Sequence, residues 1–119
     1  MELEIGGVVR ELRFGTGFVR KLDQNYKANA NGIEFGIGLL VANMQLSQMN
    51  PAILSDVIRC AAKGNLRERE VDAFLDDYAE EEEGLAGLFE DITSELGKSF
   101  VVKDTLKKLQ ATAKPVVED

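Results

Sequence analysis

Residues 13–26 read RFGTGFVRKLDQNY, and residues 34–45 read EFGIGLLVANMQ. Both stretches contain Phe-Gly-x-Gly followed by a hydrophobic residue, with Phe14 and Phe35 as the two phenylalanines. Glycine lets a backbone turn sharply, and the hydrophobic residues after each glycine pair recur with helical spacing. We therefore expect each pair to shape a junction between a strand and a helix, with its phenylalanine packed inward.

A phosphate-binding loop is the alternative explanation for these glycines. A dinucleotide-binding loop requires Gly-x-Gly-x-x-Gly, but the third glycine position holds Arg20 in the first stretch and Val41 in the second. The Gly-Lys-Ser at residues 97–99 is the ending of a P-loop, but the upstream glycine that this loop needs would fall at Ile92. The sequence therefore predicts structural glycines and no nucleotide site.

The residues before the first glycine pair alternate as in a β-hairpin. Gly6-Gly7 supplies a two-residue turn, which pairs Ile5 with Val8 and Leu3 with Arg10. A slip of one residue would turn Leu3 and Ile5 toward water, so the register is specified. The hydrophobic face of this hairpin is expected to contain Leu3, Ile5, Val8, Leu12 and Phe14.

Helical periodicity dominates the rest of the chain. Helices are expected at about 16–26, 37–48 and 51–63, around 71–78 and 85–96, and in a last amphipathic segment before Pro115. Residues 27–32 have turn composition, and a third short strand fits residues 33–35. The predicted fold class is α+β: an N-terminal β-hairpin with room for a third short strand, then five or six α-helices, with helix dominant.

Local signals predict where some elements begin and end. Asn50-Pro51 is typical of a helix start, and Asn65 with Glu68 forms a capping-box pattern. The length favours a single domain, which we place at residues 1–114, with a frayed tail at 115–119.

Composition argues against several function classes. The net charge of −7 disfavours nucleic acid and anionic membranes as partners, and polar residues interrupt the uncharged segment 35–55 before it could span a bilayer. The chain has no histidine, and its acidic cluster at 72–83 lacks the spacing of a calcium loop. Cys60, the single cysteine, is expected to be a packed thiol in a reducing cytoplasm. We expect no enzymatic activity, no cofactor and no metal.

The helix at 37–48 has two hydrophobic stripes. Ile37, Leu40, Val41 and Met44 form the stripe that we expect to face the core. The opposite stripe contains Leu39, Ala42, Leu46 and Met49. A helix that is hydrophobic on two sides is either wholly buried or contacts a partner. Burial is the default, and the candidate partner or oligomer surface is Leu39, Leu46 and Met49, or the last amphipathic helix through Leu106 and Leu109.

The sequence resembles a known family over about residues 1–110. MELEIGGVVRELRFGTGFVRKLDQNY at 1–26, followed by NGIEFGIGLL at 31–40, is similar to the tail assembly chaperones of long-tailed phages and prophages, particularly those of Gram-positive hosts. The later segments LSDVIRCAAKG, REVDAFLDDYAEEE and LFEDITSEL are similar to the helices that follow in that family. The resemblance is clearest in residues 2–40.

This resemblance implies a protein without catalytic activity. It implies that the chain binds the tape measure protein in the host bacterial cytoplasm, keeps it soluble while the tail tube assembles, and is absent from the mature virion. It also implies a longer form of the protein, made by programmed ribosomal frameshifting, of which this chain would be the short form. Further copies of the chain are additional expected partners, through head-to-tail contacts.

Two other classes remain open at this point. One is a small acidic adaptor or inhibitor that binds a host protein, although a mimic of nucleic acid would need carboxylates spread over its surface and not concentrated at 72–83. The other is a minor structural protein of the tail. Detection in purified particles would favour the second class, and a nucleotide or metal recovered with the protein would instead indicate an enzyme.

Overall fold

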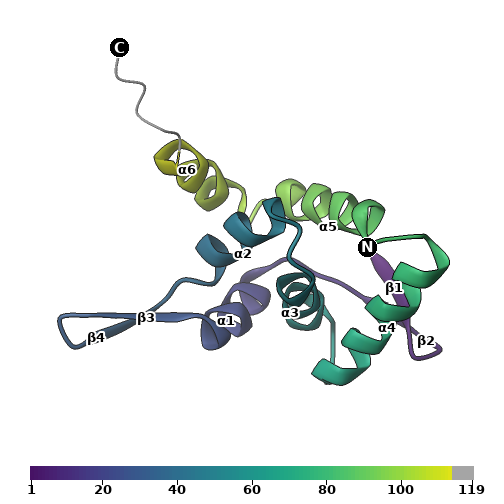
Figure 1. Ribbon diagram of the computed structural model, residues 1–119. Coiled ribbons are helices and arrows are strands. Elements are labelled where there is room, and N and C mark those ends of the chain that lie inside the picture. Colours follow the sequence, from purple (N-terminus) through teal and green to yellow (C-terminus); the bar gives the residue numbers. More distant parts are fainter. Residues whose placement is uncertain (114–119) are drawn as a thin grey trace, which may run out of the picture.

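The computed structural model of this chain describes residues 1–113 (Figure 1). Its fold is α+β with helix dominant, as predicted. The elements are β1 (Glu2–Ile5), β2 (Val8–Glu11), α1 (Thr16–Asn25), β3 (Lys27–Ala30), β4 (Ile33–Gly36), α2 (Gly38–Ser47), α3 (Pro51–Ala61), α4 (Glu68–Glu81), α5 (Ala86–Lys98) and α6 (Lys103–Ala113). The frayed tail expected at 115–119 lies outside the described residues, and the domain limits of 1–114 stay a prediction.

The N-terminal hairpin has the predicted register. Ile5 pairs with Val8 and Leu3 with Arg10, and Gly6 and Gly7 both have positive φ angles, as a two-residue turn requires. The strand continues past its last ladder pair, because Leu12 forms an isolated bridge with Ala62 at the end of α3. The expectation for Val8 was wrong: it is exposed, since it follows the turn at the tip of the hairpin.

A second hairpin, β3–β4, was only half predicted. The third strand expected at 33–35 is confirmed within β4, but residues 27–30 form its partner strand and were wrongly assigned to a turn. The turn is confined to Asn31 and Gly32, which both have positive φ angles. Asn-Gly is the strongest short hairpin signal, and it was present at this position. We call residues 27–36 the β3–β4 arm, because Figure 1 shows them extending away from the helices.

The core is centred on α3, which lies between α1 and α4 (Figure 1). Four α3 side chains are fully buried: Ile53, Leu54, Val57 and Ile58. They join Ile5 and Phe14 from the N-terminal segment and Leu22 from α1 in one hydrophobic cluster. The N-terminal hairpin and the helices are thus held together by the buried face of α3.

The helix starts follow local chemistry in one case and packing in another. Asn50 caps α3 as predicted, because its side-chain oxygen accepts a hydrogen bond from the Ala52 N–H at 2.9 Å. The capping box expected at Asn65 is wrong: α4 is capped at Arg67, whose N–H donates to Glu70 Oε1 at 3.2 Å. The side chain of Leu66 is buried, so the chain stays extended through Arg67 before the helix begins.

No helix within residues 1–113 is long and apolar enough to cross a membrane. The uncharged segment 35–55 is instead divided among the end of β4, helix α2 and the start of α3.

Candidate functional site

The face of α2 that packs on the core is opposite to the face that we expected. Leu39, Ala42 and Leu46 are buried, whereas Leu40 and Met44 are exposed. Ile37 and Val41 are half-buried. The prediction that the Leu40 and Met44 stripe forms the core face was therefore wrong, and the default of burial holds for Leu39 and Leu46.

The small residues of α2 explain this orientation. A Cβ atom on Gly38 would lie 2.8 Å from both the backbone carbon and Cγ of Leu22 in α1. Ala42 is one helical turn further along and is fully buried. Gly38 and Ala42 thus mark the side of α2 on which helix α1 can approach closely, and Leu46 continues the same side.

The proposed partner-surface residues are not equally accessible in the folded chain. Leu39, Leu46 and Leu106 are buried, and Leu109 is partly buried against the core. Helix α6 packs on α2 and α5, so the two candidate surfaces belong to helices that contact each other within one chain. Of the five residues, Met49 is exposed. A role for the other four in binding would require α6 or α2 to move.

The exposed hydrophobic residues of α2 define a different surface, which we call the outer stripe: Leu40 and Met44. They lie one helical turn apart. Met49 follows the C-terminal end of the helix with a φ of 56° and borders a hollow of about 450 Å³ against α5, together with Ala86 and Phe89. Met44 brings to the outer stripe a flexible side chain, which adapts to varied apolar partners.

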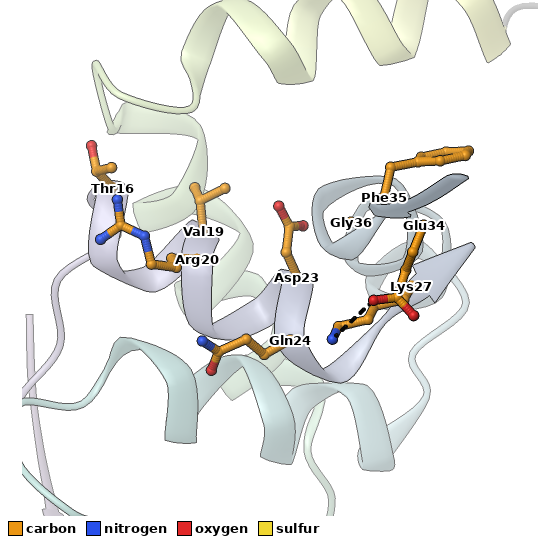
Figure 2. A pocket seen from close by; sticks show the side chains of 9 residues that line it. All are labelled: Thr16, Val19, Arg20, Asp23, Gln24, Lys27, Glu34, Phe35 and Gly36. Atoms are coloured by element: carbon orange, nitrogen blue, oxygen red, sulfur yellow. Dashed lines mark ion pairs between the residues drawn. The ribbon is translucent and has the colours of Figure 1, made fainter. Parts of the chain in front are cut away.

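A groove lies between α1 and the base of the β3–β4 arm (Figure 2). Its volume is about 390 Å³. Val19 and Phe35 supply its apolar surface, and Arg20 lies on the α1 side. Lys27 Nζ and Glu34 Oε1 are 3.5 Å apart across the arm, as the dashed line in Figure 2 marks. The expectation that Phe35 packs inward was wrong, because it is 47% exposed, whereas Phe14 is buried as expected.

Asp23 fixes the arm and α2 to α1. Its Oδ1 accepts a hydrogen bond from the Gly38 N–H at 2.9 Å, which supplies the N-terminus of α2 with a carboxylate that Ile37 at the cap position cannot provide. A Cβ on Gly36 would lie 2.3 Å from Asp23 Cγ. The second glycine pair therefore lets the chain approach α1 closely. Figure 2 shows Asp23 beside Gly36.

A polar network fixes the same, C-terminal end of α1 to α3. The Tyr26 hydroxyl donates to Asp56, whose other carboxylate oxygen lies 3.1 Å from Arg59 Nη2. Burial and the neighbouring carboxylate raise the pKa of Tyr26, so its hydroxyl remains protonated as a donor. Asn25 donates to the Cys60 sulfur at 3.5 Å, and burial raises the pKa of that thiol. These contacts hold the end of α1 against α3, so we assign this network a structural role.

The described residues do not bring metal-binding groups together. Within residues 1–113 no three Cys, Asp or Glu side chains are arranged to hold a metal ion. Cys60 is buried and has no histidine near it, because the sequence contains none. What the surface offers is apolar contact area, on the outer stripe and on the arm.

A family model described as phage tail assembly chaperone protein, TAC, matches residues 2–110. The matched range runs from β1 into the last turn of α6, and so includes the outer stripe and the arm. No curated protein and no solved structure matches the chain.

Proposed function

Since this chain belongs to the family of phage tail assembly chaperones, we propose that it binds the tape measure protein and keeps that protein soluble while the tail tube assembles. On this proposal it acts without catalysis in the cytoplasm of a Gram-positive host and leaves the tail before the virion is complete. The observation that carries the proposal is the family match over 2–110. An acidic adaptor has no comparable support.

The outer stripe is the surface that we assign to the client. Leu40 and Met44 present apolar side chains at i and i+4, the spacing at which one helix contacts another. A chaperone must hold exposed apolar stripes of its client reversibly, and methionine suits that role because it adapts without demanding one geometry. Many copies bound weakly along one long client gain avidity without tight individual contacts.

Substitution of this stripe tests the assignment. We expect the double variant Leu40→Ser, Met44→Ser to reduce the soluble fraction of a co-expressed tape measure protein by about tenfold, the effect of losing about 1.4 kcal/mol of binding. The matched control is Phe100→Ser, Val101→Ser, which removes two exposed apolar side chains from the α5–α6 connection. Equal soluble fractions for the two double variants would show that the client does not bind at the stripe.

The short-form proposal has its own test. Expression of the gene with its native downstream DNA should give two products that share this N-terminus, the longer one diverging near residues 105–119. Intact mass spectrometry of both products would locate the divergence. A single product of 119 residues would remove the frameshift from the proposal and leave the chaperone assignment in place.

A further inference from the structure

A hollow of about 660 Å³ lies between α4 and the β1–β2 turn, and two aromatic rings border it. Phe74 and Tyr78 lie one turn apart on α4, with ring centroids 6.0 Å apart, and both side chains are half-buried. Gly6 and Gly7 border the hollow from the turn, and Cβ atoms on either glycine would meet open space. The turn therefore leaves the hollow unfilled beside α4 (Figure 1).

The rim of this hollow is acidic. Glu4, Glu70, Asp77 and Glu81 line it, and none of its lining residues is basic. Arg10 Nη2 lies 3.9 Å from Glu70 Oε2 and offsets the charge of that carboxylate. The other three carboxylates are exposed and form no ion pair with any residue of the part that the structure describes. Three negative charges around the two rings thus have no partner in the folded chain.

Rings and carboxylates in this arrangement match the side chain of lysine or arginine. The face of an aromatic ring attracts a cation, and the apolar stem of a long basic side chain packs on the ring. The carboxylates of the rim supply the opposite charge. A metal ion is the poorer match, because no three carboxylates within residues 1–113 are arranged to hold one.

The shape of the surface favours a segment of a protein chain over a single small cation. From Glu70 to Glu81 the lining residues follow helical spacing, so they share one face of α4 over about 16 Å. Residues 70–97 contain eleven acidic residues and no basic one. A basic segment that approaches this side is therefore attracted before it makes contact.

From these observations we infer that the Phe74–Tyr78 hollow binds a basic segment of a partner protein, with a lysine or arginine side chain against the two rings. This surface belongs to α4 and the β1–β2 turn, whereas the outer stripe belongs to α2. The inference does not require the partner to be the tape measure protein. Binding should weaken as salt rises, because opposite charges face each other across the contact.

A fluorescent helical peptide built from alanine and lysine is the probe, and a peptide with glutamate in place of lysine is its reference. Asp77→Lys, Glu81→Lys reverses the charge of the rim. Its matched control is Asp76→Lys, Asp91→Lys, which changes the net charge equally at exposed positions outside the hollow. Fluorescence anisotropy at low salt gives the dissociation constants, with circular dichroism as the folding control.

A second pair of variants tests the rings. Phe74→Leu, Tyr78→Leu keeps apolar side chains but removes both ring faces, and Tyr78→Phe is the control that keeps them. We expect the leucine variant to bind the lysine peptide at least about threefold more weakly than wild type, and Tyr78→Phe to bind it like wild type. If the leucine variant does not fold, the two charge variants decide the inference.

We expect wild type to bind the lysine peptide and not the glutamate peptide. The rim variant should bind the lysine peptide at least about tenfold more weakly, and its charge-matched control at most about threefold more weakly. Equal weakening by both charge variants would show general attraction to an acidic protein and would overturn the inference. A wild type that does not bind the lysine peptide, or a folded leucine variant that binds it like wild type, would overturn it too.

Discussion

Gly38→Ala is expected to lower the free energy of unfolding by about 1–3 kcal/mol, the cost of overpacking a well-packed contact. The added Cβ would lie 2.8 Å from the backbone carbon and Cγ of Leu22. Leu22 is fully buried, and one of the two close atoms belongs to its backbone, which a change of rotamer cannot move away. Relief would require α2 to move away from α1, which would also stretch the 2.9 Å hydrogen bond from the Gly38 N–H to Asp23.

Gly17→Ala is the matched control, because Gly17 is also a helical glycine in a Phe-Gly-x-Gly stretch. No atom lies within 4 Å of the position that its Cβ would occupy. Alanine favours helix over glycine by about 0.5–1 kcal/mol, so this variant should be as stable as wild type or slightly more stable. Urea unfolding of both variants measures the difference. Equal stability of the two alanine variants would contradict the close contact between α2 and α1.

Leu46→Ser is expected to cost about 3–5 kcal/mol, which would remove much of the stability of a domain this size. The substitution leaves a cavity in the core and places a hydroxyl there that has to find a partner. Met44→Ser is the control on the same helix: Met44 is 50% exposed, and its replacement should change stability by no more than about 0.5 kcal/mol.

The two serine variants also decide which face of α2 is the core face. Thermal unfolding followed by circular dichroism gives their relative stability directly. If Met44→Ser proved the more damaging, the Leu40 and Met44 stripe would be the buried one, and the assignment of the outer stripe to the client would be wrong.

Features encoded by neighbouring residues could be predicted from the sequence. The Gly6-Gly7 turn specifies the register of β1 and β2, and Asn50 with Pro51 specifies the start of α3, since each depends on two adjacent residues. The missed strand β3 reads KANA, so its alternating hydrophobic residues are only the small Ala28 and Ala30, which are depleted in strands. Its stronger signal was the Asn31-Gly32 turn, which requires a strand on both sides.

The orientation of α2 could not be predicted from hydrophobicity, because both of its faces are hydrophobic. Packing decides between them: Gly38 must face Leu22, and that requirement determines where every other α2 side chain points. Leu39 and Leu46, named as a candidate partner surface, are buried in the folded chain, as the default interpretation of that stripe expected.

The two Phe-Gly-x-Gly stretches look alike but serve the fold differently. Gly36 and Gly38 permit close approach to α1, whereas Cβ atoms on Gly15 and Gly17 would meet open space. Phe14 packs edge-on against Phe18, with ring centroids 5.1 Å apart, whereas Phe35 lies exposed beside the groove. The sequence repeat indicated two strand-to-helix junctions, but only packing distinguishes their roles.

The central claim is that this chain binds the tape measure protein, and affinity purification of the tagged chain from cells that produce both proteins tests it most directly. The account predicts that the tape measure protein is recovered with the wild-type chain, that the Leu40→Ser, Met44→Ser variant recovers much less of it, and that purified virions contain no detectable chain. Failure to recover the tape measure protein, together with presence of the chain in virions, would contradict the account and indicate a structural component of the tail.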